Sequence, residues 1–435
     1  MFDCFISKEI KTTNSPTKNY FRTVNFNMKQ KQIRIQDYNY ELPTELIAQY
    51  PLPQRDKARV IVYRNGAITE KNFSQVADII PAETLLVFND TKVIRARLFF
   101  KSGSGSTIEI FCLEPVTPFT DLRIAIFAHE PTVWRCMVGN AKRWKGDSLE
   151  KFFSAKNSIS KLRASLVEKE GETFLIKFEW DNYDFSFASV IEAAGLIPLP
   201  PYMRREAELK DSDSYQTIFG QQDGSVAAPT AGLHFTEAVF DSLKQHKIDI
   251  AFLTLHVGAG TFRPVKTETL EGHQMHGERI YVNRIFIEKL LKHISDGKPV
   301  AAVGTTSLRT LESLYWLGVK YSLGDKSFEL NQWEVYESPM AETSMSAAEA
   351  LQSLLNYLDA EEKNELSCAT HLLCAPGYQF RTIDILFTNF HLPQSTLLLL
   401  VSAFVGEDWK KIYDYAKANR FRFLSYGDTS VLFRK

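Results

Sequence analysis

Cysteine is scarce in this chain, which has five cysteines among 435 residues. Small secreted domains that depend on disulfides carry a much denser set, so the sequence excludes that class. The first 32 residues are polar and of mixed charge, and they lack the apolar core of a signal peptide. We therefore expect free thiols in a reducing compartment and a cytoplasmic protein.

Long apolar runs and an excess of one charge are also lacking. The most apolar stretch is residues 396–405, whereas a bilayer span needs about 20 residues. This stretch predicts a buried helix and no membrane association. Lys and Arg number 51 and Asp and Glu number 52, which gives a net charge of -1. Binding to nucleic acid through overall positive charge is excluded, so any contact with RNA must use a local basic patch.

What is present is the composition of a folded globular protein, with 44% hydrophobic and 24% charged residues. Disordered, collagen-like and coiled-coil chains are excluded by these proportions. The length predicts two or three domains. For residues 1–32 we expect a disordered tail, or translation from a start upstream of Met28, where the patterned sequence begins.

Residues 85–180 alternate apolar and polar side chains over short stretches, and glycine- and serine-rich turns separate these stretches. An alternation of period two is typical of strands, and no helical pattern of useful length intervenes. The segment therefore predicts a small β-barrel or sandwich. The run LLVF at 85–88 is expected to be its first strand.

After residue 198 the pattern becomes strand, glycine-containing turn and helix, repeated several times. Such repeats predict an α/β domain with a mostly parallel sheet. We assign 33–84 and 181–435 to this catalytic domain, with the barrel of 85–180 inserted into it. Residues 318–375 are less regular and are expected to form an extended surface segment.

Ligands of open α/β sheets bind beyond the carboxyl ends of the strands. The turns expected there are rich in small and polar residues. GTTS at 304–307 opens a helix whose free N–H groups suit an anion, and Arg309 adds a charge in the first turn. Plain capping of the helix is the alternative interpretation. The substrate-binding candidates are Asn89, Thr230, Gly232, Gly258, Gly260, Thr261, Thr305, Thr306, Ser307, Arg309 and Asn389.

Three histidines stand in these turns and are candidate bases: His234, His256 and His391. Histidine titrates near neutral pH, which suits proton abstraction, although a structural role is the common alternative for each. Asp90 is a fourth catalytic candidate. His273 and His276 are three residues apart, but adjacent glycines favour a loop, so no metal site is expected.

Basic residues gather at two places in the predicted barrel. Alternate residues of a strand share a face, so Arg95 and Arg97 are expected to lie together. Lys92 joins them only if the strand starts after it. Such clusters suit a phosphate backbone, and ordinary solvated charge is the alternative. The candidates for contact with RNA are Lys92, Arg95, Arg97, Lys142, Arg143 and Lys145.

Ten short strings, taken in order, resemble the S-adenosylmethionine:tRNA ribosyltransferase-isomerase family of queuosine synthesis. They span roughly residues 33–435, which makes a chance match very improbable. The strings are YPLPQR at 50–55, LVFNDTKV at 86–93, LPPY at 199–202, YQT at 215–217, VAAPTAGLHF at 226–235, TLHVGAGTF at 254–262, HQMH at 273–276, GTTS at 304–307, TNFHLP at 388–393 and FLSYGD at 423–428. The tail before Met28 and the segment 318–375 depart from the family's usual length.

The resemblance implies an α/β domain with an inserted β-barrel and a defined reaction. The ribosyl group of S-adenosylmethionine would be transferred to tRNA and isomerised there. The acceptor would be an aminomethyl-deazaguanine at the wobble position, and the products epoxyqueuosine-tRNA, adenine and methionine. S-adenosylmethionine would serve as co-substrate, and neither a cofactor nor a metal is expected.

Such a reaction needs a base to remove a proton from C5′, a carbon acidified by the neighbouring sulfonium. Positioning and electrostatics would supply most of the catalysis. The expected partners are tRNA and S-adenosylmethionine, and we expect a monomer. Two alternatives stay open: an enzyme that uses S-adenosylmethionine or a nucleoside without RNA, and a non-catalytic RNA-binding module.

Overall fold

The computed structural model describes residues 29–146, 148–155, 158–258 and 265–434. Most of the predicted tail, residues 1–28, lies outside the described residues. Residues 29–32 do not behave as a tail, because they pack on the body of the protein. The carbonyl of Lys31 accepts a hydrogen bond from the N–H of Glu271 (3.0 Å), and its ammonium lies 5.6 Å from the ring centre of Trp333.

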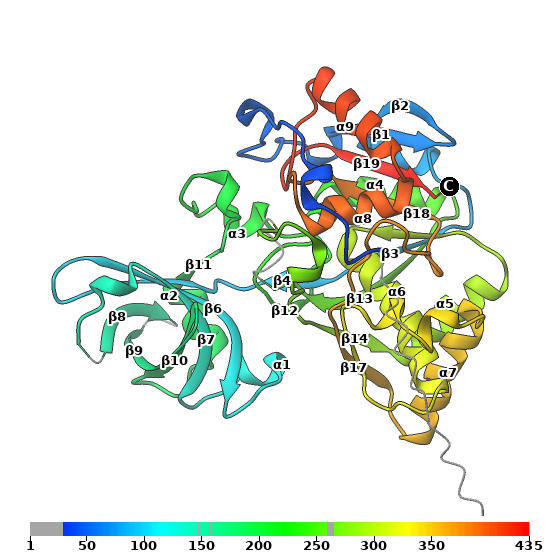
Figure 1. The fold of residues 1–435 in the computed structure, drawn as a ribbon. Helices are drawn as coiled ribbons and strands as arrows, with labels where there is room; N and C mark the ends of the chain where they lie inside the picture. Colours follow the sequence, from blue (N-terminus) through cyan, green and yellow to red (C-terminus); the bar gives the residue numbers. More distant parts are fainter. Residues whose placement is uncertain (1–28, 147, 156–157, 259–264, 435) are drawn as a thin grey trace, which may run out of the picture.

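A large sheet forms one half of the molecule, with helices on both of its faces (Figure 1). In the described residues its strand order is β16-β17-β14-β13-β3-β15-β18-β19-β1-β2. These strands are β16 (Glu329–Leu330), β17 (Glu365–Thr370), β14 (Glu278–Asn283), β13 (Asp249–His256), β3 (Leu85–Asn89), β15 (Val300–Val303), β18 (Ile385–Asn389), β19 (Thr429–Phe433), β1 (Arg59–Arg64) and β2 (Ala67–Asn72). An α/β architecture is thus confirmed.

The expectation of a mostly parallel sheet needs correction, because the sheet is mixed. Its four central strands β13, β3, β15 and β18 run parallel, while β14 and β19 run antiparallel to their inner neighbours. A single crossover helix brings the chain back to the end of the sheet where the previous strand began, so that the next strand runs parallel. Two helices, α8 (Thr396–Val405) and α9 (Asp408–Ala418), connect β18 to β19 instead. The chain therefore enters β19 at the end where β18 finished, and the two strands run antiparallel.

A second, curled sheet forms the other half of the molecule (Figure 1). Its order is β11-β5-β6-β7-β10-β9-β8, and β5 approaches β8 without a hydrogen-bonded ladder between them in the described residues. Trp134 and Phe187 fill its interior, with ring centres 5.1 Å apart. Its strands are β5 (Arg97–Lys101), β6 (Thr107–Thr117), β7 (Thr132–Gly139), β8 (Ser148–Ala155), β9 (Ser158–Glu170), β10 (Thr173–Trp180) and β11 (Gly195–Leu196).

The predicted start of the inserted unit at residue 85 is wrong. The strand Leu85–Asn89, expected as the first of the barrel, pairs with β13 and β15 at the centre of the large sheet. All five of its residues are buried. A continuous apolar run is typical of a strand covered on both faces, which is a property of central parallel strands.

Residues 318–375 were expected at the surface, and this prediction is also wrong. The segment supplies β16 and β17 to the large sheet and the helix α7 (Ala347–Ala360), which packs on α6 (Thr305–Ser322). A Cβ added to Gly318 would lie 2.0 Å from the carbonyl oxygen of Ala350, so only glycine permits this close approach of the two helices. The buried side chains of α7 belong to the main hydrophobic core.

Other described elements complete the connections. The short strands β4 (Thr91–Val93) and β12 (Gln222–Ser225) pair with each other where the chain passes between the two sheets. The remaining α-helices are α1 (Leu122–Ala125), α2 (Phe187–Ala194), α3 (Asp211–Ser214), α4 (Glu237–Gln245) and α5 (Arg284–Ser295). The four cysteines within the described residues are free and buried. In that same part of the chain, no helix has the length and apolarity to cross a membrane.

Candidate active site

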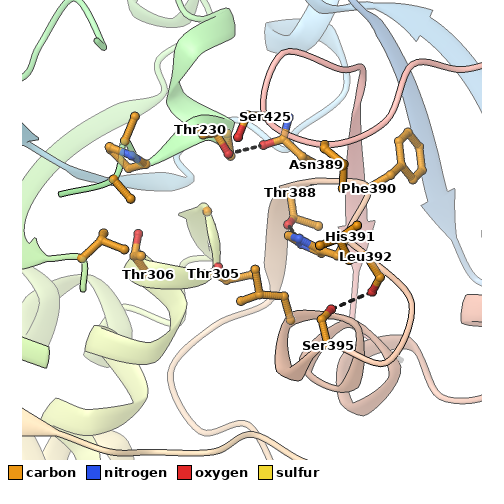
Figure 2. Close-up of a pocket in the computed structure, with 18 of the residues that line it drawn as sticks. Thr230, Thr305, Thr306, Thr388, Asn389, Phe390, His391, Leu392, Ser395 and Ser425 are labelled. Carbon is orange, nitrogen blue, oxygen red and sulfur yellow. Dashed lines mark hydrogen bonds between the residues drawn. The ribbon is translucent and has the colours of Figure 1, made fainter. Parts of the chain in front are cut away.

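A hollow opens beyond the carboxyl ends of β13, β15 and β18, where parallel sheets bind ligands. We call it the strand-end hollow. Figure 2 shows Thr305 and Thr306 on one side of it, with Thr388, Asn389 and His391 on the other. The sequence predicts four of these five residues as site residues, and it misses Thr388 although that residue begins the string TNFHLP.

Two polar atoms in the strand-end hollow are buried without a hydrogen-bond partner among the described residues. They are Oγ1 of Thr306 and Nδ2 of Asn389. The hydroxyl of Thr230 donates to Oδ1 of Asn389 (2.9 Å), which holds the amide so that its NH₂ group remains for another acceptor. Buried polar groups are nearly always paired in native proteins. These two atoms therefore indicate a place that a polar ligand completes.

The amino end of α6 lies on the same wall of this hollow. Its N-cap residue is Gly304, at a positive φ of 88°, and no side chain caps the first turn. A helix of 18 residues presents free N–H groups and a partial positive charge at this end. The arrangement suits an electron-rich group, as the sequence predicts for Thr305 and Thr306.

His391 lies on the opposite wall and is held firmly. Its Nε2 lies 2.7 Å from the hydroxyl of Thr388, and its backbone N–H donates to the phenolic oxygen of Tyr413 (3.0 Å). Burial lowers the pKa of His391 to about 3. The imidazole is therefore neutral at physiological pH, the state that a proton acceptor requires.

Ser307 and Arg309 do not lie in the strand-end hollow. The hydroxyl of Ser307 donates to the carbonyl of Val303, the last residue of β15 (2.8 Å). Arg309 lines a second hollow of about 330 Å³, which we call the arginine hollow. There Nε donates to the carbonyl of Leu372 (3.0 Å), and Nη1 donates to Glu278. Leu397 lines both hollows, so they adjoin.

His256 lines a third space, of about 540 Å³, between the curled sheet and the large sheet. We call it the inter-sheet cleft. Nδ1 of His256 lies 2.8 Å from the hydroxyl of Thr91, and its buried Nε2 has no partner in the described part of the chain. Burial and, to a lesser degree, the nearby Arg123 lower its pKa to about 4. The ring is thus neutral and oriented by its hydroxyl partner.

The three spaces meet around two residues at the end of β13. Val257 lines the strand-end hollow and the inter-sheet cleft, and Gly258 lines the arginine hollow and the cleft. Two other predicted site residues of this turn, Gly260 and Thr261, lie outside the described residues. The junction places His256 and His391 on neighbouring spaces that share one wall.

His234 stands apart from this junction. It lines a small cavity together with Arg55 and Arg422, and this cavity adjoins the strand-end hollow at Ser425. Its Nδ1 lies 3.3 Å from the carbonyl oxygen of Arg55, and its buried Nε2 has no partner in the described residues. Burial lowers its pKa to about 4. Gly232 from the same turn does not line the strand-end hollow, and a Cβ there would lie 2.7 Å from the ring of Phe219. Its role is therefore close packing.

Asn89 and Asp90 support the backbone and line none of these spaces. The amide of Asn89 donates to the carbonyl of Leu255 (2.9 Å) and accepts from its N–H (3.0 Å). The carboxylate of Asp90 accepts from the hydroxyl of Thr254 (2.7 Å), and burial raises its pKa. Their side chains join β3 to β13, and their contact with a substrate stays a prediction.

The basic residues predicted to contact RNA divide into two groups. Lys92, Arg95 and Arg97 each pair with an acid, at N–O distances of 3.6, 2.9 and 3.0 Å. By contrast, the side chains of Lys142, Arg143 and Lys145 are exposed on the turn after β7, with no acidic partner in the described residues. The second group therefore offers the less compensated charge.

Two residues that hold site groups escape sequence reasoning. Thr91, which orients His256, stands within the string LVFNDTKV, but a hydroxyl on a strand carries no signal of its own. Glu278, the partner of Arg309, directly follows HQMHG. A buried arginine needs a counter-charge, yet the sequence does not indicate which acid supplies it.

A mixed α/β sheet with a hollow at the ends of its parallel strands, apolar except for a few fixed polar groups and set beside a curled all-strand unit, is typical of an enzyme. The family described as Queuosine biosynthesis protein matches residues 35–432, and this chain belongs to that family.

Curated relatives cover nearly the same extent. The S-adenosylmethionine:tRNA ribosyltransferase-isomerase of Halothermothrix orenii is 37% identical over 407 residues, which cover 92% of this chain and 100% of the relative. The enzyme of the same name from Azoarcus sp. strain BH72 is 36% identical over 403 residues, covering 92% of this chain and 98% of the relative. A solved structure of S-adenosylmethionine tRNA ribosyltransferase from Thermotoga maritima covers 91% of this chain and 100% of its own, at 26% identity and a TM-score of 0.44.

Proposed function

We infer that this chain transfers the ribosyl group of S-adenosylmethionine to tRNA and isomerises it, in the synthesis of queuosine. Its family and its relatives over 92% of the chain support this activity. The acceptor is an aminomethyl-deazaguanine at the wobble position, and epoxyqueuosine-tRNA, adenine and methionine leave. We locate the active site at the junction of the three spaces around Val257 and Gly258, and this junction is the observation on which the proposal depends.

The strand-end hollow takes the nucleoside part of S-adenosylmethionine in this proposal. Its walls combine apolar side chains with a few fixed polar groups, as small-molecule sites usually do. Nδ2 of Asn389 and Oγ1 of Thr306 supply the unpaired polar atoms that select orientation. The substrate brings its own sulfonium, so the proposal includes neither a metal nor a further cofactor.

The inter-sheet cleft receives the modified base. Both sheets line the cleft, and it carries Arg135 and Arg279 beside His256. Arg123 of α1 donates to Glu365 of β17 (2.8 Å) and lies 3.6 Å from the ring centre of Tyr281, which ties the curled unit to the large sheet. A base in this cleft and a nucleoside in the strand-end hollow meet across Val257, where the new bond must form.

His256 and His391 are the candidate bases for removal of the C5′ proton. Both are buried and neutral, on two spaces that share Val257, whereas the cavity of His234 shares Ser425 with the strand-end hollow but contains neither Val257 nor Gly258. We place the base at His256, because its Nε2 has no partner in the described residues while Nε2 of His391 already contacts Thr388. His391 then positions the substrate in the strand-end hollow.

The curled sheet binds the anticodon arm through Lys142, Arg143 and Lys145, and the large sheet carries the chemistry. Lys92, Arg95 and Arg97 contribute less in this proposal, because their acidic partners cancel part of their attraction for phosphate. We keep the expectation of a monomeric, cytoplasmic enzyme whose partners are modified tRNA and S-adenosylmethionine.

Nucleoside mass spectrometry tests the activity directly. The protein is incubated with S-adenosylmethionine and tRNA that carries the aminomethyl-deazaguanine, and the tRNA is then digested. We expect the mass of epoxyqueuosine together with release of adenine. Adenine release without tRNA would instead indicate an enzyme of small molecules, and a tRNA unchanged in mass would reject the proposal.

A further inference from the structure

We propose that the arginine hollow binds the amino-acid end of S-adenosylmethionine, with Nη2 of Arg309 holding the carboxylate. This assignment rests on the proposed function and deepens it. The sequence places Arg309 with the first turn of α6 in a single anion site. The structure divides them, which gives the nucleoside and the amino acid separate spaces.

The hydrogen bonds of Arg309 leave one nitrogen unused. Its side chain is 8% exposed, Nε donates to the carbonyl of Leu372, and Nη1 donates to the buried Glu278. Nη2 is buried and has no acceptor in the described part of the protein. A buried N–H of a charged group that lacks an acceptor is costly, so such a group indicates a missing partner. A carboxylate is the acceptor that guanidinium matches best.

The walls of the arginine hollow suit a short aliphatic chain with charged ends. Met275 and Leu400 provide apolar surface, and Lys266 adds a second cation. Glu172, from the turn between β9 and β10 of the curled sheet, brings a carboxylate to the same space. A zwitterionic α-amino acid is a ligand class that matches a hollow lined by both cations and an acid.

The two hollows have the relation that one ligand spanning both requires. Thr306 and Arg309 are three residues apart on α6, so they are neighbours on the helix surface, yet each lines a different hollow. Leu397 is shared by both walls. A nucleoside beside Thr306 therefore has its amino-acid chain directed past Leu397 toward Arg309, with the sulfonium between them.

A ligand that lacks only the carboxylate isolates this contact. Decarboxylated S-adenosylmethionine retains the nucleoside, the sulfonium and the ammonium group. We expect calorimetry on the full chain to show that it binds at least about tenfold more weakly than S-adenosylmethionine, the scale of one lost hydrogen bond to a charged group. In Arg309→Lys we expect the affinity for S-adenosylmethionine to fall by at least about tenfold, while decarboxylated S-adenosylmethionine keeps its affinity within about twofold.

Two further variants serve as controls. Thr306→Val alters the strand-end hollow and is expected to weaken both ligands by the same factor. Arg309→Lys keeps a positive charge beside Glu278. The double variant Arg309→Gln/Glu278→Gln removes both charges together. Neither of these two variants therefore leaves a buried charge without its partner. Thermal unfolding of each variant reports whether the fold is intact.

The outcomes separate this assignment from the function on which it rests. Equal affinity of the wild-type protein for both ligands, or an equal loss of both in Arg309→Lys, would overturn the carboxylate site while leaving the proposed activity in place. Failure of the protein to bind either ligand, alone or with tRNA, would overturn the activity and the carboxylate site together.

Discussion

Two asparagines with similar burial differ in what their amides do. Nδ2 of Asn389 has no acceptor in the described residues, whereas the amide of Asn89 forms two hydrogen bonds with the backbone of Leu255. We expect Asn389→Ala to weaken S-adenosylmethionine binding about tenfold and to cost about 1 kcal/mol of unfolding free energy. Calorimetry and urea unfolding measure the two effects.

Asn89→Ala is the matched control. It leaves a backbone carbonyl and an N–H without partners in the core, so we expect a loss of about 2–3 kcal/mol in stability and an affinity unchanged within about twofold. If both variants lost affinity equally, the proposed role of Asn389 in the strand-end hollow would be wrong.

The three buried histidines are distinguished by turnover. We expect His256→Asn to lower kcat by a factor of about 100 or more, the usual contribution of a general base. His234→Asn, whose side chain lies away from the junction at Val257 and Gly258, is expected to stay within about threefold once folding is corrected for. Single-turnover formation of modified tRNA gives the rates. A loss below about threefold in His256→Asn would remove this residue as the base, and the same result in His391→Asn would end the histidine hypothesis.

The same histidines make the fold sensitive to acid. Burial lowers the pKa of His234 and His256 to about 4, whereas an unfolded histidine titrates near 6.5. Between these values the unfolded chain binds protons that the folded chain does not. Stability is therefore full above about pH 6.5 and falls as the pH decreases toward about 4, by up to about 1.4 kcal/mol per pH unit for each histidine.

Urea unfolding at about pH 7, 6 and 5 measures this slope. We expect His234→Gln to make it shallower, because the replacement removes a group whose pKa burial lowers to about 4. An identical slope in the wild-type protein and in His234→Gln would show that this histidine does not contribute to the acid sensitivity.

At the scale of the elements, the contact of α6 with α7 depends on one glycine. A methyl group at Gly318 would overlap the carbonyl of Ala350, so Gly318→Ala must separate the two helices. We expect a loss of about 1–3 kcal/mol, the usual cost of overpacking. Gly103→Ala is the control, since nothing lies within 4 Å of its added Cβ. Thermal unfolding compares the two, and equal stability of both variants would contradict the close packing.

Sequence patterns predict which helices and strands form in this protein better than they predict which of these elements lie side by side. Alternation identifies the strands of the curled sheet, and strand–turn–helix repeats identify the α/β half. The run at Leu85–Asn89 is read as a strand, but its sheet depends on pairing with β13 and β15, which are distant in sequence. The irregular stretch 318–375 looks peripheral because its two strands are short, although both extend the large sheet.

The candidate site shows the same limit. Glycine- and threonine-rich turns predict that β15 and β18 meet at one edge, and they do. The space that a side chain faces depends on its position around the axis of its helix or strand. A shift of one residue along a strand turns the side chain to the opposite face. Arg309 thus lines a different hollow from Thr306, and Asn89 points into the packing between strands.

At the scale of the whole molecule, the balance of charge predicts how tRNA binding responds to salt. With a net charge of -1, attraction for phosphates must come from local patches such as the turn after β7. We expect the triple variant Lys142→Gln/Arg143→Gln/Lys145→Gln to reduce the slope of log K against log salt by about 2–3, close to 0.9 per lost phosphate contact. Filter binding over a range of KCl concentrations measures the slope.

Lys92→Gln provides the comparison, because the acid Asp223 already offsets this charge. We expect its slope to change by less than about 0.5. An unchanged slope in the triple variant, or a slope near zero in the wild-type protein, would reject the turn after β7 as the contact with tRNA.

The first and last strands of the curled unit lie side by side, so the chain enters and leaves this unit at the same place. Arg97 of β5 and Leu196 of β11 stand opposite each other in an antiparallel pair, a geometry that puts their Cα atoms about 5 Å apart. A turn of a few residues can therefore bridge this gap if the hundred or so residues between them are excised. Binding of S-adenosylmethionine to the shortened chain would show whether the large sheet holds this ligand without the curled unit. The excised unit could be joined to another protein as an RNA-binding domain.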